Sequence, residues 1–291
     1  MTVLERNPEP SNPLGIDGIE FIEFATSQPQ GLGAVLQTMG FMPVARHRSR
    51  EVMLYRQGGM NLIVNAHPDA LPGLAAPTST PALSAFALRV RDAGYAWRHT
   101  LDLGAWEMPT RASAMELSIP GIRGVDDSLI YFVDRYRDFS IYDVDFVPLP
   151  GANPKPPAIA GLHYFGIVQT ILDERTREWV EFYRQLFGFS VLPGGQFFGI
   201  LPKGTLLESP CHKFYLQLIE PPPGAEDIEW DERLLRIGLG APDALAATRA
   251  LRDRGVIFVD RDPVQPTEKG ALTQVYLGGV TFELVVSHLK A

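Results

Sequence analysis

Glu283 is the residue whose surroundings most directly indicate chemistry, because this acid stands between Phe282 and Leu284 in an apolar stretch of the 291-residue chain. A carboxylate buried in such a strand needs a metal ion, a cation or a proton to offset its lost hydration. His163 lies in another apolar stretch, 162–168, and imidazole is the commonest metal ligand in proteins. A strand histidine nevertheless more often satisfies ordinary hydrogen bonds. The residues alone therefore predict a charged partner for Glu283 and leave the kind of partner open.

Other reactive side chains give weaker signals. Cys211 and His212 are neighbours in a loop-like segment, where adjacent side chains point in opposite directions, so we do not expect a catalytic pair. His288 follows Glu283 by five positions, which on a strand places it on the other face. The sequence has no Gly-x-Gly-x-x-Gly turn, Walker loop, Gly-x-Ser-x-Gly elbow or Cys-x-x-Cys motif. These absences argue against nucleotide-binding, serine hydrolase and thiol-redox functions.

The composition excludes several classes of protein. With 45% hydrophobic and 21% charged residues, the chain is close to an average globular protein. Its 26 Lys and Arg against 34 Asp and Glu give a net charge of −8, without the basic cluster that nucleic acids or anionic membranes attract. No apolar run reaches the roughly 18 residues of a membrane span, and the polar start at 1–13 does not resemble a signal peptide. We therefore expect a cytoplasmic protein without a nucleic-acid or membrane partner.

The segment 148–157 divides the chain into two parts. It is rich in proline, which provides no backbone donor for a helix or a sheet ladder, and it is therefore typical of a linker. The division predicts an N-terminal domain at 1–150 and a C-terminal domain at 158–291, each near the common size of a single domain.

Both parts contain the same succession of elements twice. Each quarter has an extended apolar stretch, then a stretch with helical period that ends at a glycine, then further strands. The four opening strands are expected at 16–24, 85–90, 162–168 and 234–239, and the four helices at 31–39, 93–102, 175–186 and 244–252. Four tandem β-α-β-β-β modules predict an α+β protein in which each pair of modules curls its strands into an open half-barrel, which we call a cup.

Four segments indicate a family. The segments 12–25, 45–49, 54–58 and 141–147 resemble the N-terminal half of bacterial 4-hydroxyphenylpyruvate dioxygenase, and the resemblance extends over nearly the whole chain. That family belongs to the vicinal oxygen chelate superfamily, whose paired β-α-β-β-β modules agree with the four repeats. The resemblance implies two vicinal oxygen chelate domains, with a structural N-terminal half and the active site in the C-terminal cup.

The same resemblance implies a metal site that this chain alters. The family holds Fe(II) through two His and one Glu, which leaves positions for a 2-oxo acid and dioxygen. His163 stands at the first histidine and Glu283 at the glutamate, whereas Arg236 occupies the position of the second histidine. A guanidinium keeps its proton and has no lone pair to donate. It also repels a cation by about 4 kcal/mol per unit charge at about 4 Å. A triad of the family type is therefore incomplete.

Two glutamines complete the set of candidate residues. Alignment of 214–219 with 280–285 places Gln217 at the position of Glu283, and glyoxalases of the superfamily use this strand position for a metal ligand. His163, Gln217 and Glu283 would then hold a divalent metal, with oxygen ligands that favour Mn or Mg over Fe. Gln274 matches a family glutamine that lines the pocket for the aromatic ring.

Three hypotheses follow for the function. The first is a metal-dependent, dioxygenase-like oxidoreductase that acts on a small aromatic or 2-oxo carboxylate; Arg236 would hold a carboxylate or enolate oxygen and Gln274 would orient the ring. The second is a metal-free binding or accessory protein in which Arg236 pairs with Glu283. The third is a non-oxidative, glyoxalase-like isomerase or lyase. The resemblance also implies a homo-oligomer.

Overall fold

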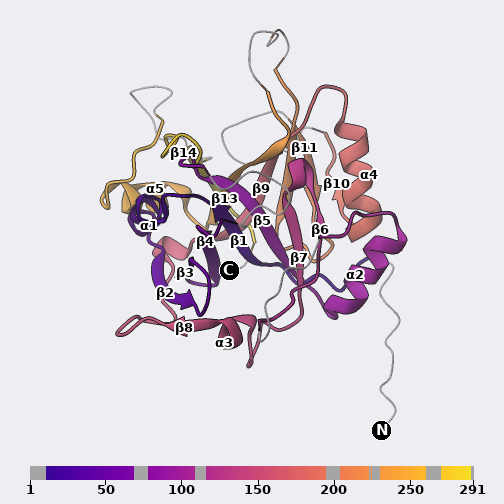
Figure 1. The fold of residues 1–291 in the computed structure, drawn as a ribbon. Helices are drawn as coiled ribbons and strands as arrows, with labels where there is room; N and C mark the ends of the chain where they lie inside the picture. Colours follow the sequence, from indigo (N-terminus) through magenta and orange to yellow (C-terminus); the bar gives the residue numbers. More distant parts are fainter. Residues whose placement is uncertain are drawn as a thin grey trace.

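The computed structural model describes residues 11–68, 78–108, 116–194, 204–222, 224, 230–259 and 270–289. Its first half forms an eight-stranded sheet in the order β6-β7-β5-β1-β4-β3-β2-β8 (Figure 1). The strands of this sheet are β1 (Ile19–Ala25), β2 (Met42–His47), β3 (Val52–Gln57), β4 (Met60–Asn65), β5 (Ala82–Arg89), β6 (Gly121–Arg123), β7 (Leu129–Val133) and β8 (Phe146–Pro148).

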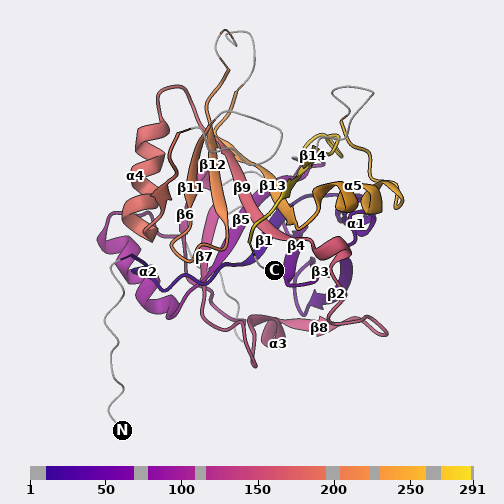
Figure 2. The same ribbon diagram turned by 180° about the vertical axis from the view of Figure 1, so that it is seen from behind.

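The second half forms a seven-stranded sheet in the order β10-β11-β12-β9-β13-β15-β14, seen from behind in Figure 2. Its strands are β9 (His163–Thr170), β10 (Ser190–Val191), β11 (Thr205–Glu208), β12 (Tyr215–Ile219), β13 (Arg233–Ala241), β14 (Gly270–Leu272) and β15 (Phe282–Val286). Parallel and antiparallel pairs occur in both sheets. The expected α+β class with two open sheets is therefore confirmed.

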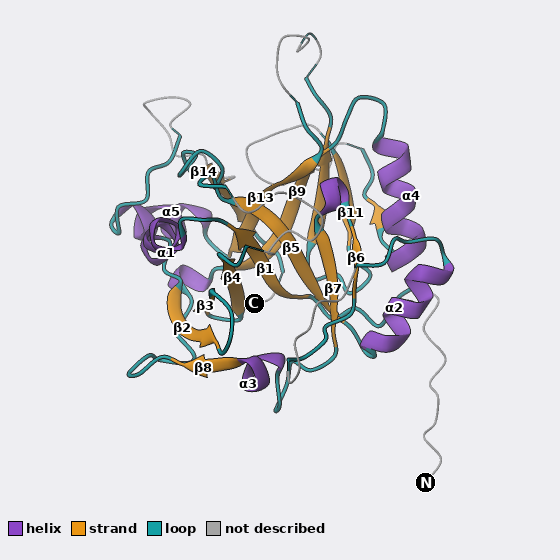
Figure 3. Ribbon diagram, viewed as in Figure 1, coloured by secondary structure: helices purple, strands orange, loops and turns teal. Residues whose placement is uncertain are grey.

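Helices cover the two edges of this double sheet (Figure 3). One edge carries α1 (Pro29–Thr38) beside α5 (Ala244–Arg252), and the other carries α2 (Ala93–Asp102) beside α4 (Thr176–Phe187). The shorter elements are α3 (Ile141–Asp145) and the 3-10 turns η1 (Val125–Asp127) and η2 (Ile159–Gly161). The helices expected at 93–102 and 244–252 have the observed bounds.

Capping residues explain where these helices begin and end. Asp92 accepts a hydrogen bond from Tyr95 N at 2.7 Å, and Asp243 accepts one from Ala246 N at 2.9 Å. Each side chain satisfies a backbone donor that the first turn leaves without a partner inside the helix. Helix α4 ends at Phe187 and is capped by Gly188, whose φ of 80° is a left-handed conformation that glycine adopts without strain.

One hydrophobic core joins the two halves. It contains Ile22 of β1 and Phe86 of β5 together with Ile237 of β13 and Phe282 of β15, all nearly inaccessible to solvent. One face of each sheet therefore packs into this shared core, and the opposite face of each sheet is its cup. The proline-rich segment also packs, because Pro156 O accepts a hydrogen bond from Gly58 N at 2.9 Å.

Candidate functional site in the C-terminal cup

The period of the strands explains why four predicted residues face the C-terminal cup. In β12, β13 and β15, the side chains at Leu216, Leu218, Ile237, Leu239, Phe282 and Leu284 belong to the shared core. Successive side chains of a strand point to opposite faces. Gln217, Arg236 and Glu283 therefore lie on the cup face, and His163 lies there at the start of β9.

The strand register places these four residues in three successive rows across the sheet. Gln217 and Arg236 are both paired with Val168 of β9, so they flank this strand in one row. Glu283 is paired with Gly238 in the next row. His163 is paired with Gly240, which lies two residues further along β13. The register thus places Arg236 and Glu283 diagonally across adjacent strands, and His163 beyond them.

Arg236 and Glu283 form a buried ion pair. Arg236 Nε lies 3.4 Å from Glu283 Oε2, and the two side chains are only 6% and 5% exposed. Burial removes most of the hydration of both charges, and their mutual attraction offsets part of that cost. The charged partner that the sequence predicts for Glu283 is therefore present in the structure, and it is a guanidinium.

His163 has a separate set of hydrogen bonds. Its Nδ1 lies 3.0 Å from Gly161 O, and its Nε2 lies 2.8 Å from Ser287 Oγ. Ser287 was not among the residues predicted for the site, and it contacts His163 from a position 124 residues further along the chain. The structure thus brings together Arg236 and Glu283, and it pairs the imidazole with a hydroxyl.

Gln217 and Glu283 line one small cavity of about 30 Å³. Phe165 and Tyr215 contribute aromatic walls to it. A space of this size holds about one water molecule, whereas pockets for drug-sized ligands measure about 300–1,000 Å³. The described lining of this cavity therefore accommodates an ion or a water, and not a whole aromatic substrate.

The structure also places His288 and Gln274, two further residues whose positions were predicted from the sequence. His288, expected on the opposite face from Glu283, lies beside Tyr215, with its Nε2 3.0 Å from Tyr215 Oη. The expectation was wrong because β15 ends at Val286 and the chain leaves the strand geometry there. Gln274 follows the end of β14, where its backbone N–H donates to Ile257 O at 3.0 Å, and its side chain is half-buried.

The donor set does not fit an iron triad of the family type. Three His, Cys, Asp or Glu side chains positioned for a metal are not found together anywhere in the described part of the chain. The family resemblance places Arg236 at the second histidine position, and in the structure its guanidinium lies beside the carboxylate of Glu283. A site that includes the amide of Gln217 is a different donor set and stays a prediction.

Buried acids also occur in the N-terminal cup, where sequence reasoning missed them. Burial raises the pKa of Glu23 to about 7, although Asn65 Nδ2 and Ser84 Oγ donate to its carboxyl at 3.1 and 3.2 Å. Glu20 forms an ion pair with Arg89 at 2.6 Å, and burial still raises its pKa. Both acids stand between apolar residues of strand β1, as Glu283 does in β15. This sequence pattern could have indicated that they are buried.

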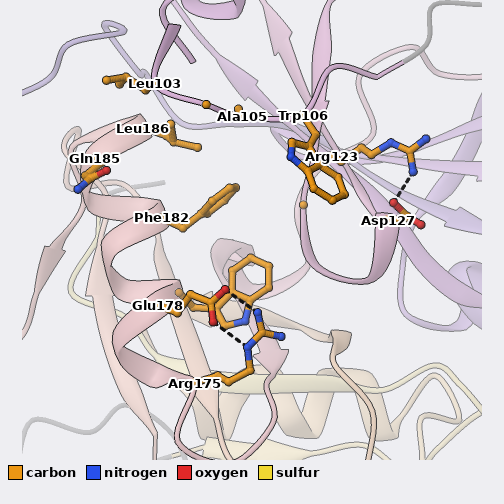
Figure 4. A pocket seen from close by; sticks show the side chains of 13 residues that line it. Leu103, Ala105, Trp106, Arg123, Asp127, Arg175, Glu178, Phe182, Gln185 and Leu186 are labelled. Atoms are coloured by element: carbon orange, nitrogen blue, oxygen red, sulfur yellow. Dashed lines mark hydrogen bonds and ion pairs between the residues drawn. The ribbon is translucent and has the colours of Figure 1, made fainter. Parts of the chain in front are cut away.

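A larger hollow lies away from both cups, between α4 and the turn that follows α2. It measures about 510 Å³. Trp106 and Phe182 point into it from opposite walls, and the pairs Arg175–Glu178 and Arg123–Asp127 lie at its ends (Figure 4). None of the five residues predicted for the C-terminal site lines this groove, so it is separate from that site.

Comparisons with known proteins agree with this fold. A solved structure of a 4-hydroxymandelate synthase variant from Streptomyces coelicolor superimposes with a TM-score of 0.70 over 96% of this chain and 94% of that protein, at 16% identity. At that identity the likeness concerns the fold alone. The sequence model of the family described as hydroxyphenylpyruvate dioxygenase, N-terminal, matches residues 11–147.

Relatives in the sequence comparisons define the family. The chain is 36% identical to hemolysin VllY of Vibrio vulnificus over 264 residues, which cover 85% of this chain and 73% of that protein. It is 32% identical to 4-hydroxyphenylpyruvate dioxygenase of Pseudomonas aeruginosa over 265 residues, 86% of this chain and 73% of the enzyme. The chain therefore belongs to the 4-hydroxyphenylpyruvate dioxygenase family, and the expected family is confirmed.

A further relative carries this domain within a longer protein. The chain is 37% identical to 3-dehydroshikimate dehydratase of Pseudomonas aeruginosa over 211 residues, which are 69% of this chain and 32% of the dehydratase. The chain thus spans about a third of that relative. Among the described residues, no helix has both the length and the apolar character that crossing a membrane requires.

Proposed function

We propose that this member of the 4-hydroxyphenylpyruvate dioxygenase family binds a small carboxylate in its C-terminal cup without a metal ion, as a binding or accessory protein or as a non-oxidative enzyme. The observation that carries the proposal is the buried contact of 3.4 Å between Arg236 Nε and Glu283 Oε2. It lies where the family resemblance implies metal ligands. A positive charge is thus already provided at this place by the chain itself.

The chemistry of arginine supports the ligand class. A guanidinium has five N–H donors in a planar fork, so it can hold a ligand carboxylate while it remains paired with a second carboxylate. Gln217 is on the same face in the same row of the sheet, and its amide supplies a further donor.

A second candidate is the metal-dependent enzyme that the family resemblance implies. The observation that favours it is that Gln217 and Glu283 line the same ion-sized cavity, on the face that also carries His163. In this proposal His163, Gln217 and Glu283 bind Mn, Mg or Fe(II), and a small aromatic or 2-oxo carboxylate is the substrate. Gln274 would orient the ring of that substrate.

Metal content separates the two candidates. Protein purified without chelator, and then incubated with Fe(II) or Mn(II) and desalted, is analysed by elemental mass spectrometry beside Glu283→Ala. We expect substoichiometric metal in both proteins. Near-stoichiometric metal that is lost in Glu283→Ala would overturn the first proposal and establish the second.

Calorimetry tests the carboxylate site directly. Formate, the smallest carboxylate and therefore the probe best matched to a cavity of about 30 Å³, is titrated into metal-free protein and into the double variant Arg236→Met with Glu283→Leu, which removes both charges and keeps a similar volume. Saturable binding is expected in the wild type and its loss in the double variant. Equal binding by the two proteins would exclude Arg236 as the carboxylate-binding residue.

A further inference from the structure

The hydrogen bonds of His163 define its protonation pattern. Gly161 O is a carbonyl oxygen and only accepts, so the proton of the neutral ring lies on Nδ1, which donates to it at 3.0 Å. Nε2 then has the lone pair, and Ser287 Oγ lies 2.8 Å from it. Leu289 N donates to the same Oγ at 3.1 Å. The hydroxyl hydrogen of Ser287 is therefore directed to His163 Nε2.

Neighbouring strands hold this pair in place. Ser287 N donates to Ala241 O at 2.9 Å, which ties Ser287 to the end of β13. Gly240 lies directly beneath the pair, because a Cβ built on it would come within 2.6 Å of both His163 Nε2 and Ser287 Cβ. Only a residue without a side chain permits this approach. Ser287 is itself buried, at 8% exposure, so its hydroxyl has a strong preference for a protein partner.

We propose that Ser287, together with Gly240, keeps His163 from serving as a metal ligand. Metal coordination by an imidazole uses the lone pair of its unprotonated nitrogen. In this chain that lone pair is the acceptor for the Ser287 hydroxyl. A metal at His163 would have to displace the hydroxyl and leave it buried without its acceptor. The inference rests on the metal-independent function proposed above. It adds Ser287 to Arg236 as a second residue that disfavours a bound metal ion.

Nitrogen NMR of the imidazole provides a test that does not depend on activity. The ¹⁵N shift of His163 Nε2 is compared in wild type, Ser287→Ala and Ser287→Thr, with His163→Gln used to assign the signal. Loss of the hydroxyl should move the shift toward that of a free unprotonated nitrogen in Ser287→Ala, and Ser287→Thr should retain the wild-type value. An unchanged shift in Ser287→Ala would overturn the inference.

Metal titration gives the functional readout. Co(II) is titrated into Arg236→His and into Arg236→His with Ser287→Ala, because the first change restores the family's second histidine. A side-chain hydrogen bond contributes about a factor of ten, so the added Ser287→Ala change should increase Co(II) affinity about tenfold. Equal affinities in the two variants would contradict the role of Ser287.

Failure of this inference is distinguishable from failure of the proposed function. Stoichiometric Co(II) binding by the wild type, lost in His163→Gln, would overturn both proposals. A wild type that binds no Co(II), combined with a Ser287→Ala variant whose Nε2 shift does not change, would overturn the role of Ser287 alone. In that case Arg236 by itself accounts for the absence of metal binding.

Discussion

The two cups of this protein arise from the same module, and they differ in what occupies them. In the N-terminal cup, Ile141, Tyr142 and Phe146 from α3 and β8 pack with Phe21 and Leu54 in one buried cluster. In the C-terminal cup, the corresponding cluster contains Phe165, Tyr215 and Val285, with Leu192 and Leu289 packed against it. The N-terminal cup is thus filled by a segment from the same half of the chain.

The ion pairs of the two cups also differ, because the arginine of the C-terminal pair is more deeply buried. The Arg89 side chain of the N-terminal pair is 28% exposed, and its Nε lies 2.6 Å from Glu20. The Arg236 side chain of the C-terminal pair is 6% exposed at 3.4 Å from Glu283. An arginine that reaches solvent keeps part of its hydration, whereas a buried one depends on its partners. Of these two arginines, Arg236 is the one whose charge is shielded from solvent.

The largest expected effect tests this difference in the ion pairs. Glu283→Ala removes the carboxylate that offsets the buried charge of Arg236, and it should lower the free energy of unfolding by about 3–5 kcal/mol. Urea unfolding at pH 7 measures the change. Glu20→Ala is the matched variant, and its loss should be smaller because Arg89 reaches water. Equal losses in the two variants would contradict the distinction drawn between the pairs.

The next effect concerns the residues that fill each cup. Phe146→Ala should destabilise the protein by about 3 kcal/mol, since it removes a nearly buried aromatic ring from a packed cluster. Leu289→Ala should cost about 1 kcal/mol, because this side chain is only partly buried against the C-terminal cluster. Thermal and urea unfolding of the two variants compare the cups directly. A larger loss for Leu289→Ala would reverse our view of which cup is filled.

A pH-dependent effect is expected for the N-terminal cup. The pKa of Glu23 is raised from 4.5 to about 7 by burial, so the folded state binds more protons than the unfolded state between these values. Stability should therefore fall as pH rises from about 4.5 to about 7, by at most about 3 kcal/mol. Glu23→Gln should flatten that part of the profile and stabilise the protein at pH 8. Urea unfolding from pH 4.5 to 8 would show an unchanged slope if Glu23 is not the group responsible.

The smallest effect is expected at Gln217. Because this side chain lines a cavity of about 30 Å³, Gln217→Leu should change the free energy of unfolding by less than about 1 kcal/mol. Gln169 is the matched control in the neighbouring strand, where its Oε1 accepts from Tyr183 Oη at 2.6 Å in the shared core. Gln169→Leu leaves that buried hydroxyl without its acceptor and should cost about 1–3 kcal/mol. Urea unfolding of both variants would disprove the assignment of faces if the order were reversed.

Local sequence patterns were sufficient to predict the positions of several helices. The helices at 93–102 and 244–252 were predicted with the observed bounds, because an apolar period of 3.6 and a glycine after the helix are both local signals. Helix α4 was predicted one residue early at each end, because the signals that mark a helix terminus are shared among neighbouring residues. The short strand β8 and helix α3 were not predicted as elements, because their stability comes from packing into the N-terminal cup.

Sequence by itself determined that Glu283 would be buried, that it needs a charged partner and that Arg236 stands where a family histidine is expected. The first two conclusions follow from the apolar residues around Glu283 and from the cost of a buried charge, and the third follows from the family resemblance. Only the tertiary structure decided that Arg236 and Glu283 meet, and that Ser287 occupies the lone pair of His163. Those contacts join strands far apart in sequence, and their register and side-chain directions are set by packing of the whole sheet.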